Sequence, residues 1–271
     1  MTPFPTVLVT GASSGIGAVY ADRLARRGHG LVLVARDEAR LRTLAERLRR
    51  ETGVEVDVLR ADLTDPVDLE IVEARLREDA RIGVLVNNAG AALFGGFDDQ
   101  SADAMARLIS LNVTAVTRLA AAVAPRFAAG AEGAIVNIAS VVGLVPEYGA
   151  AVYGATKAFV LYLSQALAFE LGPKGVYVQA VLPAATRTEI WERSGRDVNA
   201  VPGVMDVDDL VDAALAGFDR REAVTIPPLP DAALWAAYET ARKTMIPGFA
   251  NAQPAERYRE PAAAAARPVF A

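Results

Sequence analysis

The sequence predicts an α/β protein with one doubly wound parallel sheet of about seven strands. Short β-branched runs alternate regularly with longer segments of helical period. Several of these runs are almost continuously apolar, as expected of parallel strands that helices cover on both faces. We find neither an internal repeat nor a linker before residue 230. We therefore expect one domain, residues 1–230, followed by a C-terminal extension, residues 231–271.

The predicted elements follow one another in strict alternation. The strands are Thr6–Thr10, Leu31–Ala35, Val54–Arg60, Ile82–Asn87, Gly133–Ala139, Val176–Leu182 and Ala223–Ile226. The helices between them are Gly15–Arg27, Glu38–Glu51, Pro66–Asp79, Ala102–Ala128 and Ala151–Leu171. In the extension we expect one more helix, Asp231–Met245, and a loosely held tail, Gln253–Ala271, because the tail is rich in proline and alanine.

Composition excludes several classes of function. The chain has 271 residues, a net charge of −5, 52% hydrophobic residues, one histidine (His29) and no cysteine. Without cysteine there are no disulfides, zinc-thiolate sites, iron–sulfur clusters or cysteine nucleophiles. One histidine excludes multi-histidine metal sites, so we expect no metal. Mild acidity without a basic stretch argues against nucleic acid and anionic membranes as partners.

The same sequence predicts a cytoplasmic location. The N-terminus carries no basic residue before the first strand, unlike a secretory signal. No uninterrupted apolar stretch reaches the ~18 residues that span a bilayer. The alanine-rich stretch Leu119–Ala129 contains Pro125 and Arg126, which predict the end of a helix there.

A glycine-rich loop follows the first strand directly. Its sequence is Thr10-Gly11-Ala12-Ser13-Ser14-Gly15-Ile16-Gly17, and a helix comes next. The glycines permit a tight turn and a close approach of backbone to a pyrophosphate, which the helix N-terminus attracts. Strand, loop and helix in this order are the dinucleotide-binding arrangement of a Rossmann fold.

The end of the second strand indicates which dinucleotide is bound. An NAD site carries an acidic residue there, but this sequence has Ala35 and then Arg36. A guanidinium can bind a 2′-phosphate through two hydrogen bonds, so Arg36 favours NADP(H) over NAD(H). We expect Asp37, which follows, to cap the next helix.

Tyr153 and Lys157 lie four residues apart near the start of a predicted helix, on one face. A free tyrosine, with a pKa near 10, is a poor base at neutral pH. A nearby ammonium and an oxidised nicotinamide both favour phenolate, so we expect a lowered pKa for Tyr153.

Three further features support a site here. Ser140 follows the fifth predicted strand, at the carboxyl edge of the sheet where open α/β folds bind ligands. The fourth strand ends at the same edge in Asn87-Asn88-Ala89-Gly90. Asn112 lies inside a predicted helix, where asparagine is unfavourable.

Taken together, these residues resemble the single-domain short-chain dehydrogenases/reductases. The resemblance covers roughly residues 6–190. The matching set is Thr10-Gly-x-x-x-Gly-x-Gly17, Asp62-Leu63, Asn87-Asn-Ala-Gly90, Asn112, Ser140 and Tyr153-x-x-x-Lys157.

The resemblance implies a catalytic tetrad of four residues. Tyr153 would exchange a proton with the substrate oxygen, and Ser140 would hold and polarise that oxygen. Lys157 would bind the nicotinamide ribose and lower the pKa of Tyr153. Asn112 would hold a water that links Lys157 to solvent.

It also implies cofactor contacts outside the tetrad. Asp62 would contact the adenine amino group, and Asn88, Ala89 and Gly90 would line the adenosine side. The full set that we expect to bind NADP(H) is Gly11, Ser13, Ser14, Gly15, Ile16, Gly17, Arg36, Asp62, Leu63, Asn88, Ala89, Gly90, Tyr153, Lys157, Pro183 and Thr188.

The sequence departs from the family pattern at two places. Ala184 follows Pro183 where such proteins have glycine, which affects the shape of the nicotinamide pocket. Ser14 stands where many NADP-dependent relatives carry a basic residue, so phosphate recognition depends more heavily on Arg36.

We therefore expect an NADP(H)-dependent oxidoreductase that transfers hydride between nicotinamide and a carbonyl or secondary alcohol. The candidate substrate segments are mostly apolar, which favours a medium-sized ketone or aldehyde. The segments are Ala91–Phe94, Val141–Leu144, Pro146–Tyr148 and Ile190–Trp191, with Arg187 or Arg193 as the candidates for holding an anionic group.

Two alternative functions, and the oligomeric state, also follow from the sequence. The same fold could serve as a non-catalytic NADP(H)-binding regulator or scaffold, although such a protein has no need for Ser140 together with Tyr153. A serine hydrolase lacks a well-placed histidine, since His29 falls at the opposite end of the sheet. Trp191 is either a pocket residue or a packing residue. By resemblance, a homodimer or homotetramer forms through the two long helices.

Overall fold

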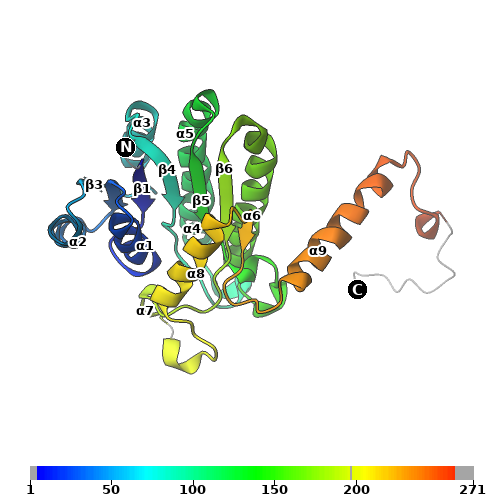
Figure 1. The fold of residues 1–271 in the computed structure, drawn as a ribbon. Helices are drawn as coiled ribbons and strands as arrows, with labels where there is room; N and C mark the ends of the chain where they lie inside the picture. The colour runs from blue at the N-terminus through cyan, green and yellow to red at the C-terminus, as the bar shows by residue number, and fades with distance from the viewer. Residues whose placement is uncertain (1–4, 196, 260–271) are drawn as a thin grey trace. The chain divides into compact units, whose positions relative to one another are not determined.

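A computed structural model describes residues 5–195 and 197–259 of the chain, and it contains one seven-stranded sheet (Figure 1). Every pairing is parallel, in the order β3-β2-β1-β4-β5-β6-β7. The predicted doubly wound fold is confirmed. The strands are β1 (Thr6–Thr10), β2 (Leu31–Ala35), β3 (Val56–Arg60), β4 (Ile82–Asn87), β5 (Ala134–Ile138), β6 (Tyr177–Val181) and β7 (Val224–Thr225).

Helices cover both faces of this sheet (Figure 1). The helices α1, α2 and α8 pack on one face, and α3, α5 and α6 pack on the other. The bounds are α1 (Gly15–Arg26), α2 (Glu38–Thr52), α3 (Pro66–Glu78), α4 (Ala102–Ile109), α5 (Val116–Gly130), α6 (Ala151–Leu171), α7 (Ile190–Arg193), α8 (Val207–Asp219) and α9 (Ala232–Thr244).

Strand β1 shows how the sheet divides the core into two layers. Val7 and Val9 point to the face under α1 and α8, whereas Leu8 points to the face under α3 and α5. All three side chains are 0% exposed. This alternation follows from the two-residue period of a strand, and burial on both faces explains why the sequence shows an unbroken apolar run.

Helix starts agree with the sequence-based expectations. The Asp37 carboxylate accepts a hydrogen bond from the Arg40 N–H (3.0 Å) and caps α2. At α3 the Asp65 carboxylate accepts from Val67 and Asp68, and Pro66 occupies the first turn. Short polar side chains at these positions satisfy N–H groups that have no partner within the helix.

The helix predicted over Ala102–Ala128 differs from expectation in two ways. Six residues, Ser110–Ala115, form a π turn between α4 and α5. Pro125 does not end the helix, which runs through it to Gly130. By length and composition the segment Ala102–Gly130 could cross a membrane, but it buries Leu119, Val123 and their neighbours against the sheet. It is therefore a core helix of this fold.

The chain divides into two compact units, with the boundary after Pro228. All seven strands belong to the first unit. In the described part of the second unit, 229–259, helix α9 has no buried residue. The tail expected from Gln253 onward includes a short 3₁₀ turn, Glu256–Tyr258, and its last twelve residues, 260–271, lie outside the described part.

Candidate active site

The carboxyl ends of the strands bring the predicted polar residues to one edge of the sheet. Thr10 is the last residue of β1, Asn87 is the last of β4, and Ser140 follows β5 by two positions. Because β1, β4 and β5 are neighbours and parallel, these ends lie side by side. The candidate site lies at this edge.

Thr10 and Asn88 clamp the glycine loop. The Thr10 hydroxyl accepts hydrogen bonds from the Asn88 and Ala89 N–H groups, both at 3.0 Å. The Asn88 amide donates to the carbonyls of Thr10 (2.8 Å) and Gly11 (3.3 Å). The side chain of Asn88 therefore holds the glycine loop in place, a role that was not predicted from the sequence.

Two glycines of the loop have no room for a side chain. A Cβ on Gly17 would lie 2.4 Å from both the Asn88 amide nitrogen and the Gly11 carbonyl oxygen. Gly11 itself has φ +66°, a conformation that favours glycine. Ser13, Ser14 and Ile16 are partly exposed beside them.

Helix α1 begins at this loop with no acidic residue in its first turn. The positive end of its dipole is therefore not offset by a carboxylate of that turn. Backbone close to the surface, small side chains and this helix end fit a bound pyrophosphate.

On the predicted adenosine side, Arg36 is open to solvent. Its side chain is 70% exposed, and one guanidinium nitrogen lies 4.0 Å from a carboxylate oxygen of Asp62. Burial alone would raise the pKa of Asp62, but hydrogen bonds from Thr64 and the charge of Arg36 outweigh it and leave that pKa below its usual value. Leu63 is buried in the core, so only its backbone can face a nucleotide.

Ser140, Tyr153 and Lys157 meet under the edge of the sheet, and all three are nearly inaccessible to solvent. The Ser140 hydroxyl lies close enough to Tyr153 to lower the pKa of the phenol. Ser140 Oγ also donates to the Pro183 carbonyl (3.2 Å). Lys157 Nζ donates to the Ile138 carbonyl (2.8 Å) and lies 5.8 Å from the centroid of the Tyr153 ring.

The expected lowering of the Tyr153 pKa is wrong for the protein alone. Burial raises the pKa of Tyr153 to about 12, and the neighbouring Ser140 hydroxyl offsets only part of this rise. Burial also lowers the pKa of Lys157 to about 8. Removing both groups from water disfavours the charged form of each, and at this distance the ammonium does not overcome that cost.

Asn112 lies in the π turn, and its side chain is fully engaged. Its Oδ1 accepts from the Ala91 N–H (3.0 Å), and its Nδ2 donates to the Ala91 carbonyl (3.0 Å) and to Thr156 Oγ1 (3.1 Å). Thr156 in turn donates to the Tyr153 carbonyl (2.7 Å). This contact ties the π turn to the helix that carries Tyr153 and Lys157, and the role of Thr156 was not predicted.

Gly90 lies where these groups converge. A Cβ there would be 3.3 Å from Asn112 Oδ1 and 3.5 Å from Lys157 Nζ. The segment after β4 thus passes close to the Lys157 ammonium.

The segment after β6 reaches back to the glycine loop. A Cβ on Gly15 would lie 3.2 Å from Thr188 Cγ2. Next to it, Glu189 accepts two hydrogen bonds of 2.8 Å from the Arg40 guanidinium at the start of α2. This ion pair was not predicted, since its partners lie 149 positions apart in the sequence.

The substrate candidates assemble partly as expected. Phe94 and Trp191 stack with ring centroids 5.8 Å apart and planes inclined by 6°. The Phe94 ring also lies 5.9 Å from that of Tyr153. Arg187 is exposed and donates to Asn199 (3.1 Å), and the side chain of Arg193 lies outside the described part.

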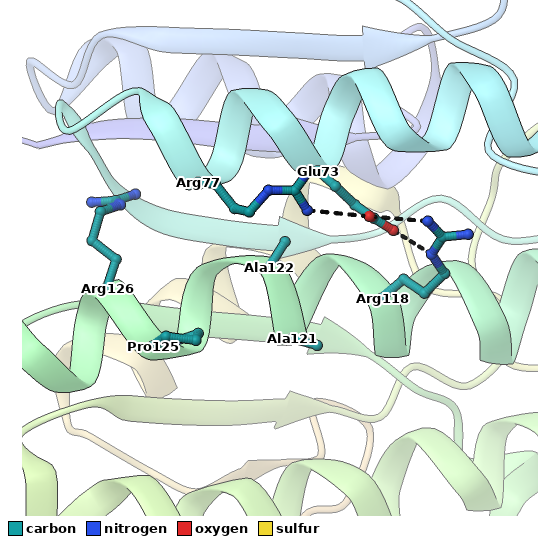
Figure 2. A pocket seen from close by; sticks show the side chains of 7 residues that line it. All are labelled: Glu73, Arg77, Arg118, Ala121, Ala122, Pro125 and Arg126. Carbon is teal, nitrogen blue, oxygen red and sulfur yellow. Dashed lines mark hydrogen bonds and ion pairs between the residues drawn. The ribbon is translucent and has the colours of Figure 1, made fainter.

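Two other features fall away from this edge. His29 Nδ1 lies 2.8 Å from the Pro5 carbonyl, at the amino end of the strands. A cavity of about 470 Å³ opens between α3 and α5, lined by Glu73, Arg77, Arg118, Ala121, Ala122, Pro125 and Arg126 (Figure 2). The part of the chain that the structure describes holds no group of three His, Asp or Glu residues that fits a metal ion.

Comparison with known proteins agrees with this geometry. The sequence model of the short chain dehydrogenase family matches residues 5–199. A very-long-chain 3-oxoacyl-CoA reductase from Anas platyrhynchos is 34% identical over 190 residues, which cover 68% of this chain and 60% of that protein. The chain thus matches only about three fifths of the length of such curated relatives.

Two solved structures are more similar. A short-chain dehydrogenase from Sphingobium yanoikuyae in complex with NADPH has 67% identity and a TM-score of 0.93, covering 94% of this chain and 100% of that one. A bulky-bulky ketone specific alcohol dehydrogenase from Comamonas testosteroni has 59% identity and a TM-score of 0.89, with 96% and 100% covered.

Proposed function

Because the chain belongs to the short-chain dehydrogenase family, we propose that it is an NADP(H)-dependent oxidoreductase that reduces a medium-sized apolar ketone or aldehyde. The observation that carries the proposal is the buried Tyr153–Ser140 pair beside Lys157, at the edge where the glycine loop opens. The NADPH complex of the Sphingobium yanoikuyae neighbour supports the choice of cofactor. The ketone specificity in the name of the Comamonas testosteroni neighbour supports the choice of substrate.

NADP(H) would lie along the carboxyl edge and supply the hydride. The α1 N-terminus and the backbone of Gly11, Gly15 and Gly17 would hold its pyrophosphate. Arg36, exposed at the end of β2, would bind the 2′-phosphate. Thr188, packed against the glycine loop, would face the carboxamide end.

The buried pair Tyr153 and Ser140 would carry the proton chemistry. A phenol with a pKa near 12 keeps its proton at neutral pH, which is the form that donates to a carbonyl oxygen during reduction. Ser140 would hold that oxygen beside the phenol.

Lys157 and Asn112 would return the proton from solvent. The Asn112 side chain is occupied by Ala91 and Thr156, so a relay water would meet its main-chain carbonyl, at a π turn. Such turns recur at functional sites because they leave backbone groups outside the regular ladder.

The proposal extends to assembly and location. Helix α6 carries Phe159, Tyr162 and Phe169 on one outward face, exposed by 37%, 74% and 83%. An apolar stripe of this kind suits burial against a second copy, which agrees with a homodimer or homotetramer. We place the enzyme in the cytoplasm.

Two measurements test the proposal. Titration of the purified protein should give tight NADPH binding and weak NADH binding; the reverse order would contradict the role of Arg36. Tyr153→Phe should lower NADPH-dependent ketone reduction by roughly a thousandfold or more while NADPH still binds. Turnover retained in that variant would contradict the mechanism, and a scaffold function would be indicated by binding of NADPH without oxidation of it by any ketone or aldehyde.

A further inference from the structure

Three aromatic rings form a row that begins at the proposed proton donor, Tyr153. Tyr153 stands at one end, the Phe94 ring lies 5.9 Å from it at an angle of 58°, and Trp191 stacks on Phe94 at 5.8 Å. The three residues come from α6, from the segment after β4 and from α7. The row therefore brings three separate parts of the chain together at the site.

In this arrangement little of the two residues that a ketone must contact is open to solvent. Tyr153 is 9% exposed and Ser140 is 5% exposed. A carbonyl oxygen has to come within hydrogen-bond distance of the phenol and of Ser140 to be reduced. Phe94 is one of the side chains packed around Tyr153, so a substrate next to the phenol competes with its ring for space.

The two stacked rings are anchored unequally. The indole N–H of Trp191 donates to the Thr186 carbonyl at 2.7 Å. Thr186 is buried and pairs with Met205 in a short bridge, with backbone hydrogen bonds on both sides. The indole is thus fixed to backbone that is itself held in place.

Phe94 has no polar atom that can be tied down in this way. It lies in a segment without helix or strand, and Gly95 and Gly96 follow it directly. Gly95 has φ +117°, which permits backbone rotations that other residues resist. Of the two rings, Phe94 is the one that the local backbone allows to move.

We propose that Trp191 is an aromatic platform for the substrate and that Phe94 is a plug that occupies the substrate's place on it. An aryl group then takes over the stacking that the Phe94 ring provides, next to Tyr153. The substrate class is a ketone with one aryl or other planar substituent on the carbonyl carbon. The proposal rests on the proposed function, since it concerns the same site.

The platform and the plug predict effects of opposite sign. Phe94→Ala removes a competitor, so the KM for phenyl propyl ketone should fall, by about threefold. Trp191→Leu removes the stacking surface, so kcat/KM for phenyl propyl ketone relative to cyclohexyl propyl ketone should fall by about fivefold. These two ketones share one carbon skeleton and differ in whether the ring is planar. Trp191→Phe keeps a ring and should retain most of that preference.

A matched control is available in the same segment. Phe97→Ala removes a phenyl ring that is 65% exposed, three positions beyond Phe94, and should leave both kinetic values unchanged. NADPH affinity and melting temperature, measured for each variant, report whether the fold is intact. A rise in KM in Phe94→Ala would overturn the plug, and an unchanged aryl preference in Trp191→Leu would overturn the platform.

A binding experiment separates this proposal from the proposed function. The chain has two tryptophans, so Trp235→Phe leaves Trp191 as the sole indole. In that protein with NADPH bound, phenyl propyl ketone should quench the indole fluorescence more strongly than cyclohexyl propyl ketone. Quenching without reduction of either ketone would contradict the proposed function and keep the platform. Reduction with equal quenching by the two ketones would contradict the platform and keep the proposed function.

Discussion

The nucleotide side and the substrate side of the carboxyl edge are held together by different forces. On the nucleotide side, the glycine loop is clamped by five hydrogen bonds among Thr10, Gly11, Asn88 and neighbouring backbone, and its glycines tolerate no added carbon. On the substrate side, Phe94 and Trp191 contact each other by ring stacking. Hydrogen bonds and close backbone packing fix distances to fractions of an ångström, whereas apolar contacts permit sliding. One side is suited to a constant ligand and the other to ligands of varied shape.

The largest effect should follow from filling the rigid side. Gly17→Ala places a methyl group 2.4 Å from the Asn88 amide and the Gly11 carbonyl, so the loop must shift. Because displacements near 1 Å can cost about a hundredfold, NADPH affinity should fall by about that factor or more. Isothermal titration measures it. Gly130→Ala, where a Cβ meets nothing within 4 Å, is the control. Equal affinities in the two variants would remove the distinction between a rigid and an adaptable side.

A second test concerns the ammonium between the two sides. Burial lowers the pKa of Lys157 from 10.5 to about 8, so the unfolded chain binds a proton that the folded chain has released between these values. The stability of the wild type should therefore rise from about pH 8 to about pH 10, above which the raised pKa of Tyr153 opposes it.

Lys157→Met removes the cost of burying the charge. At about pH 6 its free energy of unfolding should exceed that of the wild type by on the order of 2 kcal/mol, although the hydrogen bond to Ile138 is lost, and the rise above pH 8 should vanish. Urea denaturation at several pH values measures both. Lys174→Met, on an exposed lysine, is the control. A less stable Lys157→Met would mean that the buried ammonium stabilises the fold.

A smaller effect is expected at the contact that positions Asn112. Thr156→Val keeps the shape of the side chain but removes the acceptor for Asn112 Nδ2 and the donor to the Tyr153 carbonyl. The value of kcat should fall by about fivefold with NADPH affinity unchanged, because one such hydrogen bond contributes about 1 kcal/mol. Thr156→Ser restores the hydroxyl and should restore kcat. If serine and valine reduced kcat alike, packing and not the hydroxyl would be the cause.

The smallest effect should come from the ion pair that joins the sides. Arg40 and Glu189 are 50% and 38% exposed, and pairs of this kind contribute little in water. Glu189→Gln should change kcat/KM by less than about threefold, and the difference should disappear at high salt. Kinetics at low and high ionic strength measure it. A large, salt-independent loss would show that Glu189 has a direct role at the site.

The comparison also explains what the sequence could predict. The glycine loop, Arg36, the Asp37 cap and the seven strands follow from local patterns, because each depends on residues close together in the chain. Site positions such as Ser140 follow from topology, since parallel strands end at one edge. None of these features depends on knowing which distant segments of the chain are in contact.

The rest depends on contacts between distant segments. No spacing announces that Thr156 bonds Asn112, that Arg40 meets Glu189, or that Phe94 stacks on Trp191. In the protein without cofactor the pKa of Tyr153 is raised and not lowered, because a sequence shows the neighbouring ammonium but not the depth of burial. The π turn was not predicted because its backbone hydrogen bonds span only one residue more than those of a regular α-helix.

That turn has a consequence for how the gene can change. A π turn holds one residue more than the regular ladder, so loss of one codon within Ser110–Ala115 would convert α4 and α5 into one continuous α-helix. Everything on the α4 side would then rotate by about 100° relative to α5, which carries Leu108 away from the apolar cluster that it shares with Tyr153. We therefore expect Ser110–Ala115 to tolerate substitutions more readily than a deletion, because losing one residue would separate Leu108 from the apolar cluster around Tyr153.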